Sequence, residues 1–396
     1  MSAAGADAGV QPWLGLLPYS ESDQNLFFGR EQDSLDLLRL VRREVLTVLF
    51  GRSGTGKSST LKAGLFPKLR QEQYLPVWIR LDHSGKTPYG RQVRTEIESA
   101  IAAREMEVEV LNEALADESN DFWEYLHRVV FWDSKNQPVT PVLVFDQFEE
   151  LFTLGRNRPE IVAFQEELAA VAENLIPSRV RECVVAGDAK LPASYSERHY
   201  KLMISLREDF VSRLDSLSKD MPSVMYNCHA LTHMTGEQAL EVVMKPGGNL
   251  VADAVARKIV RFVAAANEVE AIIPQKGAET VGVELQHLRV EPALLSLVCS
   301  ELNLQRIKED RDAITLEQVQ RSSDQILDDF YKRSLEGLDA RDRAFIEDRL
   351  VTASGFRTTV PVEEAILADL TDGEIECLVD RRLLRREDRS ALPTSS

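Results

Sequence analysis

Cysteine is scarce in this chain of 396 residues, which contains only Cys183, Cys228, Cys299 and Cys377. No two of them show the C-x-x-C spacing of redox motifs and zinc sites, and their scatter gives no disulfide framework. Cys228, His229 and His233 lie close in sequence, but a structural zinc site needs four ligands and no second pair is evident. The cysteine content therefore predicts reduced thiols and a cytoplasmic protein.

Long apolar segments are also missing. No apolar run approaches the ~20 residues that a helix needs to cross a bilayer. Residues 1–10 contain Asp7 but neither Lys nor Arg, so they lack the basic start of a secretory signal peptide. Both absences argue against a membrane protein or a secreted one.

Positive charge is in deficit. Lys and Arg number 47 against 64 Asp and Glu, which gives a net charge of −17. A protein that binds nucleic acid over much of its surface would be basic, so the total opposes that function. The stretch 381–389 is a local exception, because it is rich in arginine. Binding of DNA by the C-terminal region therefore stays open but is not favoured.

One complete motif stands out against these absences. Residues 51–58 read Gly-Arg-Ser-Gly-Thr-Gly-Lys-Ser and match the phosphate-binding loop G-x-x-x-x-G-K-[ST]. A β-type run over 45–50 precedes the motif and a helix-forming stretch follows it, which is the context that the motif requires. Its backbone N–H groups would surround phosphate oxygens, with Lys57 on the β- and γ-phosphates and Ser58 on Mg²⁺. The candidate nucleotide-binding residues here are Gly51, Ser53, Gly54, Thr55, Gly56, Lys57, Ser58 and Ser59.

The chain divides into an α/β part and a helical part. Further β-type runs lie at 76–81, 141–146, 202–206 and 224–228, with helical segments such as 91–116 and 159–175 between them. Runs that are apolar throughout predict parallel strands covered on both faces. The fold class is therefore α/β, with a P-loop NTPase core and a parallel sheet over 25–232, after a flexible lead-in over 1–24.

After residue 232 the strand signal fades. Helices are expected at 236–244, 251–268, 291–308 and 316–333, which predicts a helical domain over 233–334. Three short helical segments, at 341–350, 361–369 and 373–382, precede a short apolar strand. This order predicts a winged-helix-like domain over 335–396, which we expect to be truncated at its edge.

A second half of the phosphate site follows a buried strand. Asp146 ends the apolar run 142–145, the pattern in which an Asp holds Mg²⁺, usually through water. The strand at 202–206 is expected between this strand and the one before the phosphate loop. It ends in Arg207, a cation that could sense or stabilise a γ-phosphate. The alternatives are a helix-capping role for Asp146 and a surface salt bridge for Arg207.

Glutamate is absent from the position directly after Asp146, where Gln147 stands. Glu149 and Glu150 follow, and either could act as the catalytic base through one water. If both are instead solvated or ion-paired, as charged side chains commonly are, turnover would be slow. The protein would then mainly hold nucleotide as a switch.

Four segments together resemble a known family. They are LFFGRE at 26–31, GRSGTGKSSTLKAGL at 51–65, DQFEELFTL at 146–154 and LREDF at 206–210. This set resembles the bacterial STAND NTPases, which are signal-transduction ATPases with numerous domains, and within them the subgroup called novel STAND NTPase 1. The resemblance covers roughly residues 12–300 and weakens toward the end.

The resemblance implies an NTPase core, a helical lid and a winged helix that close over ATP or ADP with Mg²⁺. It places Phe28, Gly29 and Arg30 near the adenine, and Pro292 matches a lid proline that packs on the base. A winged-helix histidine touches the phosphates in related proteins, but no histidine follows His287 here. Family members also carry effector and sensor modules, which we expect on other segments or on partner proteins.

The sequence thus predicts a slow ATPase that works as a switch. By the resemblance, it would be closed with ADP at rest, open with ATP when triggered, and then homo-oligomeric, serving bacterial stress or anti-phage signalling. The first alternative is an AAA-like ATPase that binds DNA through its winged helix. The second is a scaffold protein whose nucleotide is only structural.

Overall fold

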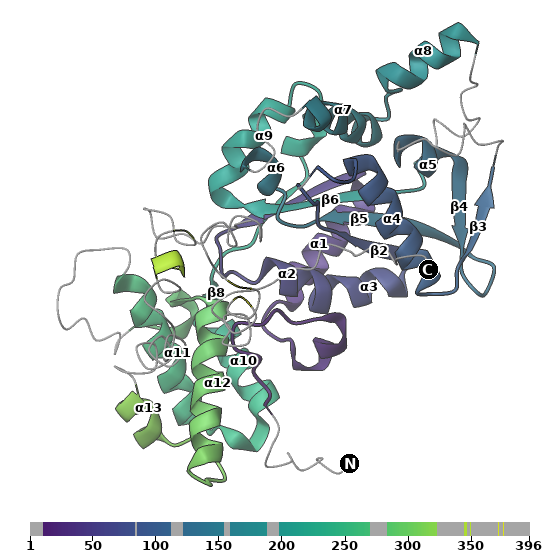
Figure 1. Cartoon of the computed structure of the whole chain (residues 1–396). Coiled ribbons are helices and arrows are strands. Elements are labelled where there is room, and N and C mark those ends of the chain that lie inside the picture. Colours follow the sequence, from purple (N-terminus) through teal and green to yellow (C-terminus); the bar gives the residue numbers. More distant parts are fainter. Residues whose placement is uncertain are drawn as a thin grey trace.

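The computed structural model describes residues 11–83, 85–111, 122–153, 159–187, 198–269 and 283–322, with the isolated residues 344–346, 349, 371 and 375. A mostly parallel sheet forms its centre (Figure 1). Its parallel strands are, in spatial order, β2 (Tyr74–Ile79), β5 (Pro138–Phe145), β6 (Lys201–Arg207), β1 (Leu46–Gly51) and β7 (Cys228–Ala230). Two antiparallel strands, β3 (Glu107–Val110) and β4 (Val129–Trp132), extend the sheet beyond β5. The α/β fold class is confirmed.

Strand β6 lies between β1 and β5, as the sequence predicts. Leu202 is opposite Leu46 of β1 on one side and Leu143 of β5 on the other. The carboxyl ends of these three strands therefore meet at one edge, where the phosphate loop and Asp146 follow. Ligands of open parallel sheets bind at this kind of edge.

Helices cover both faces of the sheet. One face carries α1 (Glu31–Arg43) and a continuous helical run made of α2 (Lys57–Ser59), the π-helical η2 (Thr60–Leu65) and α3 (Phe66–Gln71). The other face carries α4 (Tyr89–Ala102), α5 (Phe122–Arg128) and α7 (Pro159–Glu173). The shorter elements are η1 (Glu21–Leu26), α6 (Glu150–Thr153), α8 (Ser178–Ala186), η3 (Glu208–Phe210), α9 (Val211–Leu217) and η4 (Pro222–Met225).

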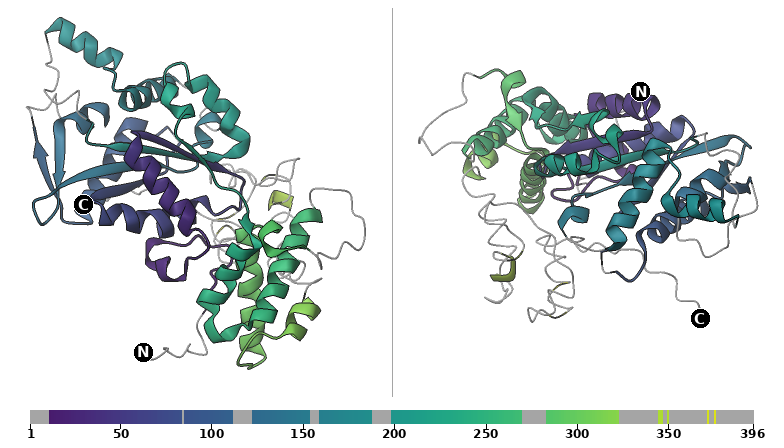
Figure 2. Two further views of the ribbon diagram at one scale, coloured as in Figure 1. Left: turned by 180° about the vertical axis from the view of Figure 1, so that it is seen from behind. Right: turned by 90° about the horizontal axis from the view of Figure 1, so that it is seen from above.

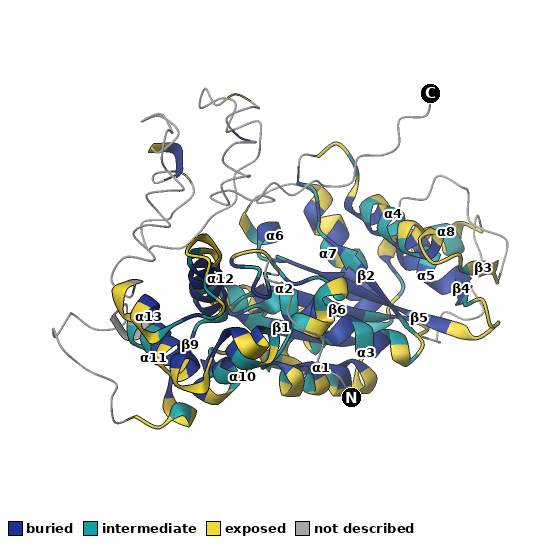
Figure 3. Cartoon of the chain, turned by 90° about the horizontal axis from the view of Figure 1, so that it is seen from below, coloured by how far each residue is buried: buried dark blue, intermediate teal, exposed yellow. Residues whose placement is uncertain are grey.

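Alternation along the strands supplies both cores. In β5, Val142 and Val144 pack with α1 and α3, whereas Leu143 and Phe145 pack on the opposite face, and all four are at most 1% exposed. Successive side chains of a strand point to opposite faces, so a run that is apolar throughout fits a sheet with two covered faces. Figure 3 shows buried residues in dark blue along the strands and on the adjoining helices.

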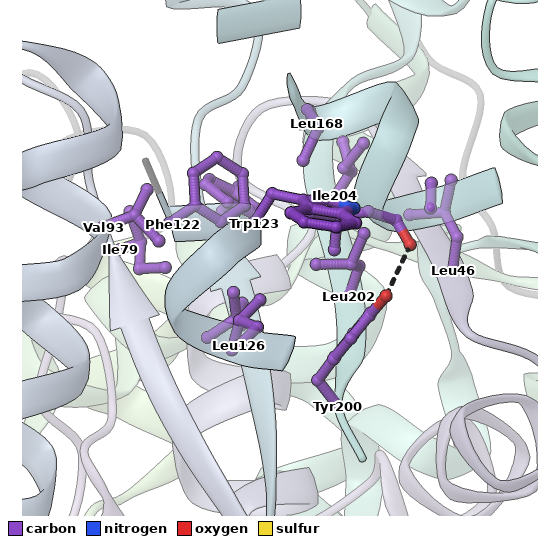
Figure 4. Packing of buried hydrophobic residues seen from close by; sticks show 14 of the residues in the cluster. Leu46, Ile79, Val93, Phe122, Trp123, Leu126, Leu168, Tyr200, Leu202 and Ile204 are labelled. Atoms are coloured by element: carbon purple, nitrogen blue, oxygen red, sulfur yellow. Dashed lines mark hydrogen bonds between the residues drawn. The ribbon is translucent and has the colours of Figure 1, made fainter. Parts of the chain in front are cut away.

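The larger core also contains aromatic residues. In Figure 4, Trp123 of α5 lies beside Leu202 and Ile204 of β6, and Phe122 lies toward Val93 and Ile79. The hydroxyl group of Tyr200 donates a hydrogen bond of 3.1 Å to the carbonyl oxygen of Val171. This satisfies the one polar atom of a phenol that is otherwise fully buried.

Two expected elements differ in the structure. The helix expected over 91–116 ends at Ala102, because Glu105 adopts a left-handed conformation (φ 52°) and the alternating segment 107–110 forms β3 instead. The strand expected at 224–228 is shifted, because Pro222 starts the turn η4 and the paired residues begin at Cys228.

A helical domain follows the sheet, which we define as residues 233–322. Its helices are α10 (Gly236–Gly247), α11 (Asp253–Val269), α12 (Pro292–Lys308) and α13 (Leu316–Ser322), with the short elements β8 (Met234–Thr235), η5 (Gly248–Leu250), η6 (Leu285–His287) and β9 (Arg289–Val290). They gather beside the sheet in Figures 1 and 2. Thr235 starts α10 with a capping box, because its hydroxyl accepts from the N–H of Gln238 at 3.2 Å. The winged-helix-like unit expected over 335–396 lies almost entirely outside the described residues.

Residues 11–27, which we call the N-terminal strap, connect the two parts. Trp13 is 0% exposed within the core of the helical domain, and its Nε1 donates to the carbonyl oxygen of Val242 at 3.1 Å. The N–H of Tyr19 donates to the Ser59 hydroxyl at 3.1 Å. An indole buried among helices therefore anchors the strap, which contains the described part of the lead-in expected over 1–24.

Across the residues that the structure describes, no helix is both long and apolar enough to span a bilayer.

Candidate functional site

The phosphate loop joins β1 to α2 and depends on three glycines. Gly54 and Gly56 have φ values of +83° and +86°, which residues with a Cβ rarely adopt. A Cβ on Gly51 would lie 2.3 Å from the carbonyl oxygen of Leu231, so close approach requires glycine there as well. Left-handed backbone of this kind lets successive N–H groups form a concave anion site, as phosphate binding needs.

Lys57 begins the helix after the loop and points back over it. Its ammonium group donates to the carbonyl oxygens of Gly51 at 2.8 Å and Arg52 at 3.0 Å. Burial lowers the pKa of Lys57 below its usual value, although the nearby carboxylates of Glu149 and Asp146 oppose that shift. A bound phosphate would add negative charge beside this partly desolvated ammonium group.

Asp146 lies directly after β5 and is 6% exposed. One carboxylate oxygen accepts from the Ser58 hydroxyl at 2.9 Å, and the other accepts from the Ser205 hydroxyl of β6 at 2.9 Å. Mg²⁺ prefers oxygen ligands and is commonly held by one carboxylate together with substrate phosphates and water. Ser58 and Asp146 fit that role. No cluster of three or more metal-ligating side chains occurs in the described part of the chain.

The two glutamates after Asp146 have different surroundings. Glu149 faces the loop, and its Oε2 accepts from the backbone N–H of Arg207 at 3.3 Å. Burial raises the pKa of Glu149 to about 7, and the charges of Asp146 and Glu150 add to the effect. Glu150 is 5% exposed and points instead to Arg80, whose Nη2 donates to it at 2.7 Å. A glutamate with a pKa near neutrality suits a general base.

Arg207 ends β6 directly opposite Gly51 of β1. Its guanidinium group forms two hydrogen bonds to Asp209, of 3.0 and 2.7 Å, and lies 5.6 Å from the ring centre of Phe210. The backbone is thus beside the phosphate loop, as the sequence predicts, while the cation is held by Asp209. Contact of this cation with a γ-phosphate would compete with its pairing to Asp209.

The FFGRE segment lies at the junction with the helical domain. The ammonium group of Lys245 in α10 lies 5.3 Å from the ring centre of Phe28. Arg30 is 3% exposed and donates to the carbonyl oxygens of Thr55 at 3.0 Å and Thr232 at 2.7 Å. Arg30 therefore supports the phosphate loop from behind, a role that the resemblance to known ATPases does not indicate.

The helical domain contacts the loop through the start of α12. Pro292 occupies the first turn of this helix, and the N–H of Ala293 donates to the carbonyl oxygen of Gly54 at 3.3 Å. The carboxylate of Glu291 lies over the same glycine, since a Cβ on Gly54 would come within 2.0 Å of its Oε1. The described structure thus brings Pro292 to the loop region.

Sequence reasoning missed four residues of this site. Ser205 could not be placed against Asp146 without the strand register, and Arg80 lies in a different strand connection from the motif that it contacts. Glu291 and Tyr19 reach the loop from distant segments. None of them belongs to a motif, so only the folded chain identifies them.

The family assignment follows from a match over most of the chain. The family model described as Novel STAND NTPase 1 matches residues 12–384. The chain belongs to this family. Membership places it among the P-loop NTPases and implies nucleotide binding, usually with Mg²⁺, which agrees with the loop and the Ser58–Asp146 pair.

Several solved structures are distantly similar to this STAND NTPase. Cdc6p from Pyrobaculum aerophilum is 16% identical with a TM-score of 0.43, over 87% of this chain and 86% of that one. The ORC1 protein of Aeropyrum pernix, solved in complex with DNA, is 12% identical with a TM-score of 0.44, over 92% and 85%. The Walker-type ATPase paby2304 of Pyrococcus abyssi is 12% identical with a TM-score of 0.40, over 92% and 91%. The search of curated protein sequences finds no match.

Proposed function

We propose that this STAND NTPase is an ATP-dependent conformational switch. It binds ADP or ATP with Mg²⁺ at the phosphate loop, hydrolyses ATP slowly, and uses the helical domain as a lid whose position depends on the nucleotide. The observation that carries the proposal is the hydrogen bond between Ala293 of α12 and Gly54 of the loop. A contact between the lid and the phosphate loop lets a change in phosphate number move the lid.

Hydrolysis would follow from the two sides of the site. Mg²⁺, held by Ser58 and Asp146, would neutralise charge on the β- and γ-phosphates. Glu149 would take a proton from water as the water oxygen bonds to the γ-phosphorus. The bond from that phosphorus to the β–γ bridging oxygen breaks, and the bridging oxygen leaves with its electron pair on ADP.

The switch needs a sizeable difference in binding energy. Moving a two-state equilibrium from 1:99 to 99:1 takes about 5.5 kcal/mol of differential binding. Lys57, Mg²⁺ and a reoriented Arg207 could each interact with a γ-phosphate that ADP lacks. A phosphate that enters the loop would repel the Glu291 carboxylate, because like charges repel. Displacement of this carboxylate would add to the difference in binding energy between the two states.

Oligomerisation on activation, and a role in bacterial stress or anti-phage signalling, are further parts of the proposal that rest on family membership. Effector and sensor modules, or partner proteins that carry them, would read the open state.

The nucleotide that copurifies with the protein tests the first step. We expect ADP or ATP, identified by chromatography of the denatured protein. Lys57→Ala should weaken nucleotide binding about 30- to 150-fold, because it removes a charge-assisted contact of about 2–3 kcal/mol. Lys68→Ala, a lysine of α3 on the same helical run, is the control and should bind as the wild type does.

Two further variants separate binding from turnover. Asp146→Ala should weaken the Mg²⁺-dependent part of ATP binding. Glu149→Gln should leave binding intact and lower kcat by about 10²-fold or more, which is the scale of general-base catalysis. Wild-type affinity in Lys57→Ala, or equal turnover in Glu149→Gln, would contradict the proposal.

A further inference from the structure

The turn between Asp146 and Glu150 has a conformation that the chain does not favour by itself. Gln147 adopts φ 54°, which is unusual for a residue with a Cβ. Such a conformation persists only where the surroundings hold it. Backbone hydrogen bonds supply part of that support. The N–H of Asp146 donates to the carbonyl oxygen of Ile79 at 3.0 Å, and the N–H of Phe148 donates to the carbonyl oxygen of Ser205 at 2.9 Å.

A side chain just beyond the end of the neighbouring strand contacts both ends of this turn. Arg80 directly follows β2, and its Nη2 donates to the side-chain oxygen of Gln147 and, at 2.7 Å, to Oε1 of Glu150. The side chains of Arg80 and Glu150 are only 13% and 7% exposed. One guanidinium group thus bridges the residue with the unusual backbone and the first residue of α6.

The remaining oxygen of Glu150 faces a second buried group. Its Oε2 lies 4.0 Å from Nε2 of His83, whose Nδ1 is 2.9 Å from the hydroxyl oxygen of Tyr89 on α4. Glu150 is therefore directed into the protein, away from the phosphate loop. Glu149, between the two residues that Arg80 holds, is directed toward Arg207 and the loop.

We infer that Arg80 is a positioning residue for ATP hydrolysis and that Glu150 is its anchor rather than the catalytic base. Arg80 holds the Gln147–Glu150 turn in the one conformation that aims Glu149 at the attacking water. This inference rests on the proposed ATPase function. A misplacement of about 1 Å in a catalytic group can lower a rate about 10²-fold, so an anchor of this kind affects kcat without touching the nucleotide.

Substitutions of Arg80 test the inference. Arg80→Met should lower kcat about 10- to 100-fold while the dissociation constants of ADP and ATP stay within about threefold of wild type. Arg80→Lys should recover part of the loss, because a lysine can pair with Glu150 but lacks the planar fork that reaches Gln147 as well. Arg70→Met is the matched control, since Arg70 forms a partly buried ion pair with Glu21 at 2.6 Å, remote from the turn.

Two variants guard against simple misfolding. Arg80→Met leaves a buried carboxylate without its cation, so the double variant Arg80→Met/Glu150→Gln removes both charges together. This double variant should fold, and it should hydrolyse ATP more slowly than the wild type does. Glu150→Gln alone keeps an oxygen for Arg80 to contact, so kcat should fall less than about fivefold, far less than in Glu149→Gln.

Hydrogen exchange gives a readout that needs no turnover. The peptide spanning residues 146–153 should exchange its amide hydrogens faster in Arg80→Met than in wild type. In Arg70→Met its exchange rate should equal that of the wild type. Wild-type exchange and kcat in a folded Arg80→Met protein would overturn the inference. Loss of hydrolysis in Glu150→Gln equal to that in Glu149→Gln would also overturn it. Absence of ATPase activity in the wild type would instead count against the proposed function, and the exchange result would still decide whether Arg80 holds the turn.

Discussion

Gly29 lies so close to the first turn of α10 that a Cβ on residue 29 would come within 2.8 Å of the carbonyl oxygen of Gln238. The same Cβ would also lie 2.9 Å from Cγ2 of Val242, and the φ of Gly29 is +78°. The glycine of the FFGRE segment is therefore a contact between the NTPase core and the helical domain. Because backbone lies on both sides of this contact, neither side can yield without a shift of α10.

Gly29→Ala should destabilise the protein by roughly 2–4 kcal/mol, because it combines left-handed strain with overpacking against a helix. Gly187→Ala is the control, since Gly187 has φ +82° and a Cβ at this position would meet no other atom within 4 Å. We expect it to cost only about 1 kcal/mol. Urea unfolding of both variants measures the difference, and equal costs would show that α10 does not press on Gly29.

Glu291→Gln should tighten ATP binding about fivefold. The Glu291 carboxylate lies over Gly54, so it repels phosphates that enter the loop, and removal of one partly solvated charge is worth about 1 kcal/mol. Glu284→Gln, at an exposed position in the same domain, should leave affinity unchanged. Calorimetric titration with ATP and ADP at two salt concentrations checks this, and the gain should shrink at high salt.

Pro292→Ala tests whether the start of α12 acts on the nucleotide. Proline is common in the first helical turn, so the helix itself should persist in the variant. If the ring packs on the adenine, ADP should dissociate faster and the hydrodynamic radius should grow. Unchanged ADP off-rates and scattering would leave Pro292 as a helix-start residue only.

Glu149 should make stability depend on pH. Its folded-state pKa of about 7 exceeds the usual 4.5, so the folded protein binds the proton more tightly than the unfolded chain does. The free energy of unfolding should therefore fall as pH rises from about 4.5 to about 7 and stay low above that. Glu149→Gln should be more stable than wild type by a few kcal/mol at most at pH 8, with little difference near pH 4. A pH-independent difference in denaturant midpoint would argue against this carboxyl group.

The pH dependence of the rate should also follow the ionisation of Glu149. If Glu149 is the base, kcat/KM for ATP should increase through about pH 7 and level off above, because only the carboxylate accepts a proton. A flat profile between pH 5.5 and 8.5, measured by phosphate release, would place the base elsewhere.

Local patterns in the sequence were sufficient for much of the core. The strand, loop and helix around residues 45–65 were predictable because hydrophobic runs and the glycine pattern are local. The position of β6 between β1 and β5 followed from the order of strands in this class of P-loop fold. The register that joins Ser205 to Asp146 is a different matter, because it depends on how two distant strands pair.

Distant contacts explain the rest. The sequence left Glu149 and Glu150 equivalent. Contacts from distant segments distinguish their surroundings, because Glu149 accepts from the N–H of Arg207 whereas Glu150 pairs with Arg80. The N-terminal strap has the composition of a loop, yet Trp13 is buried by helices more than 200 residues further along the chain. Composition reports the average character of a segment and does not show that a single indole anchors it.

The strap also means that the helical domain is not built from one continuous stretch of sequence. Trp13 belongs to the core of the helical domain, whereas η1, a few residues later, packs mainly against the helices that follow the phosphate loop and makes a smaller contact with α10. The connection between the NTPase core and the helical domain on this side of the molecule therefore lies within the strap, and not only near residue 233. If the lid swings open, residues 11–17 should travel with it, and Tyr19 should release Ser59. A fragment that begins at residue 233 would lack Trp13, a side chain of its own core. The excised helical domain should therefore fold only when the short segment 11–17 is added back to it.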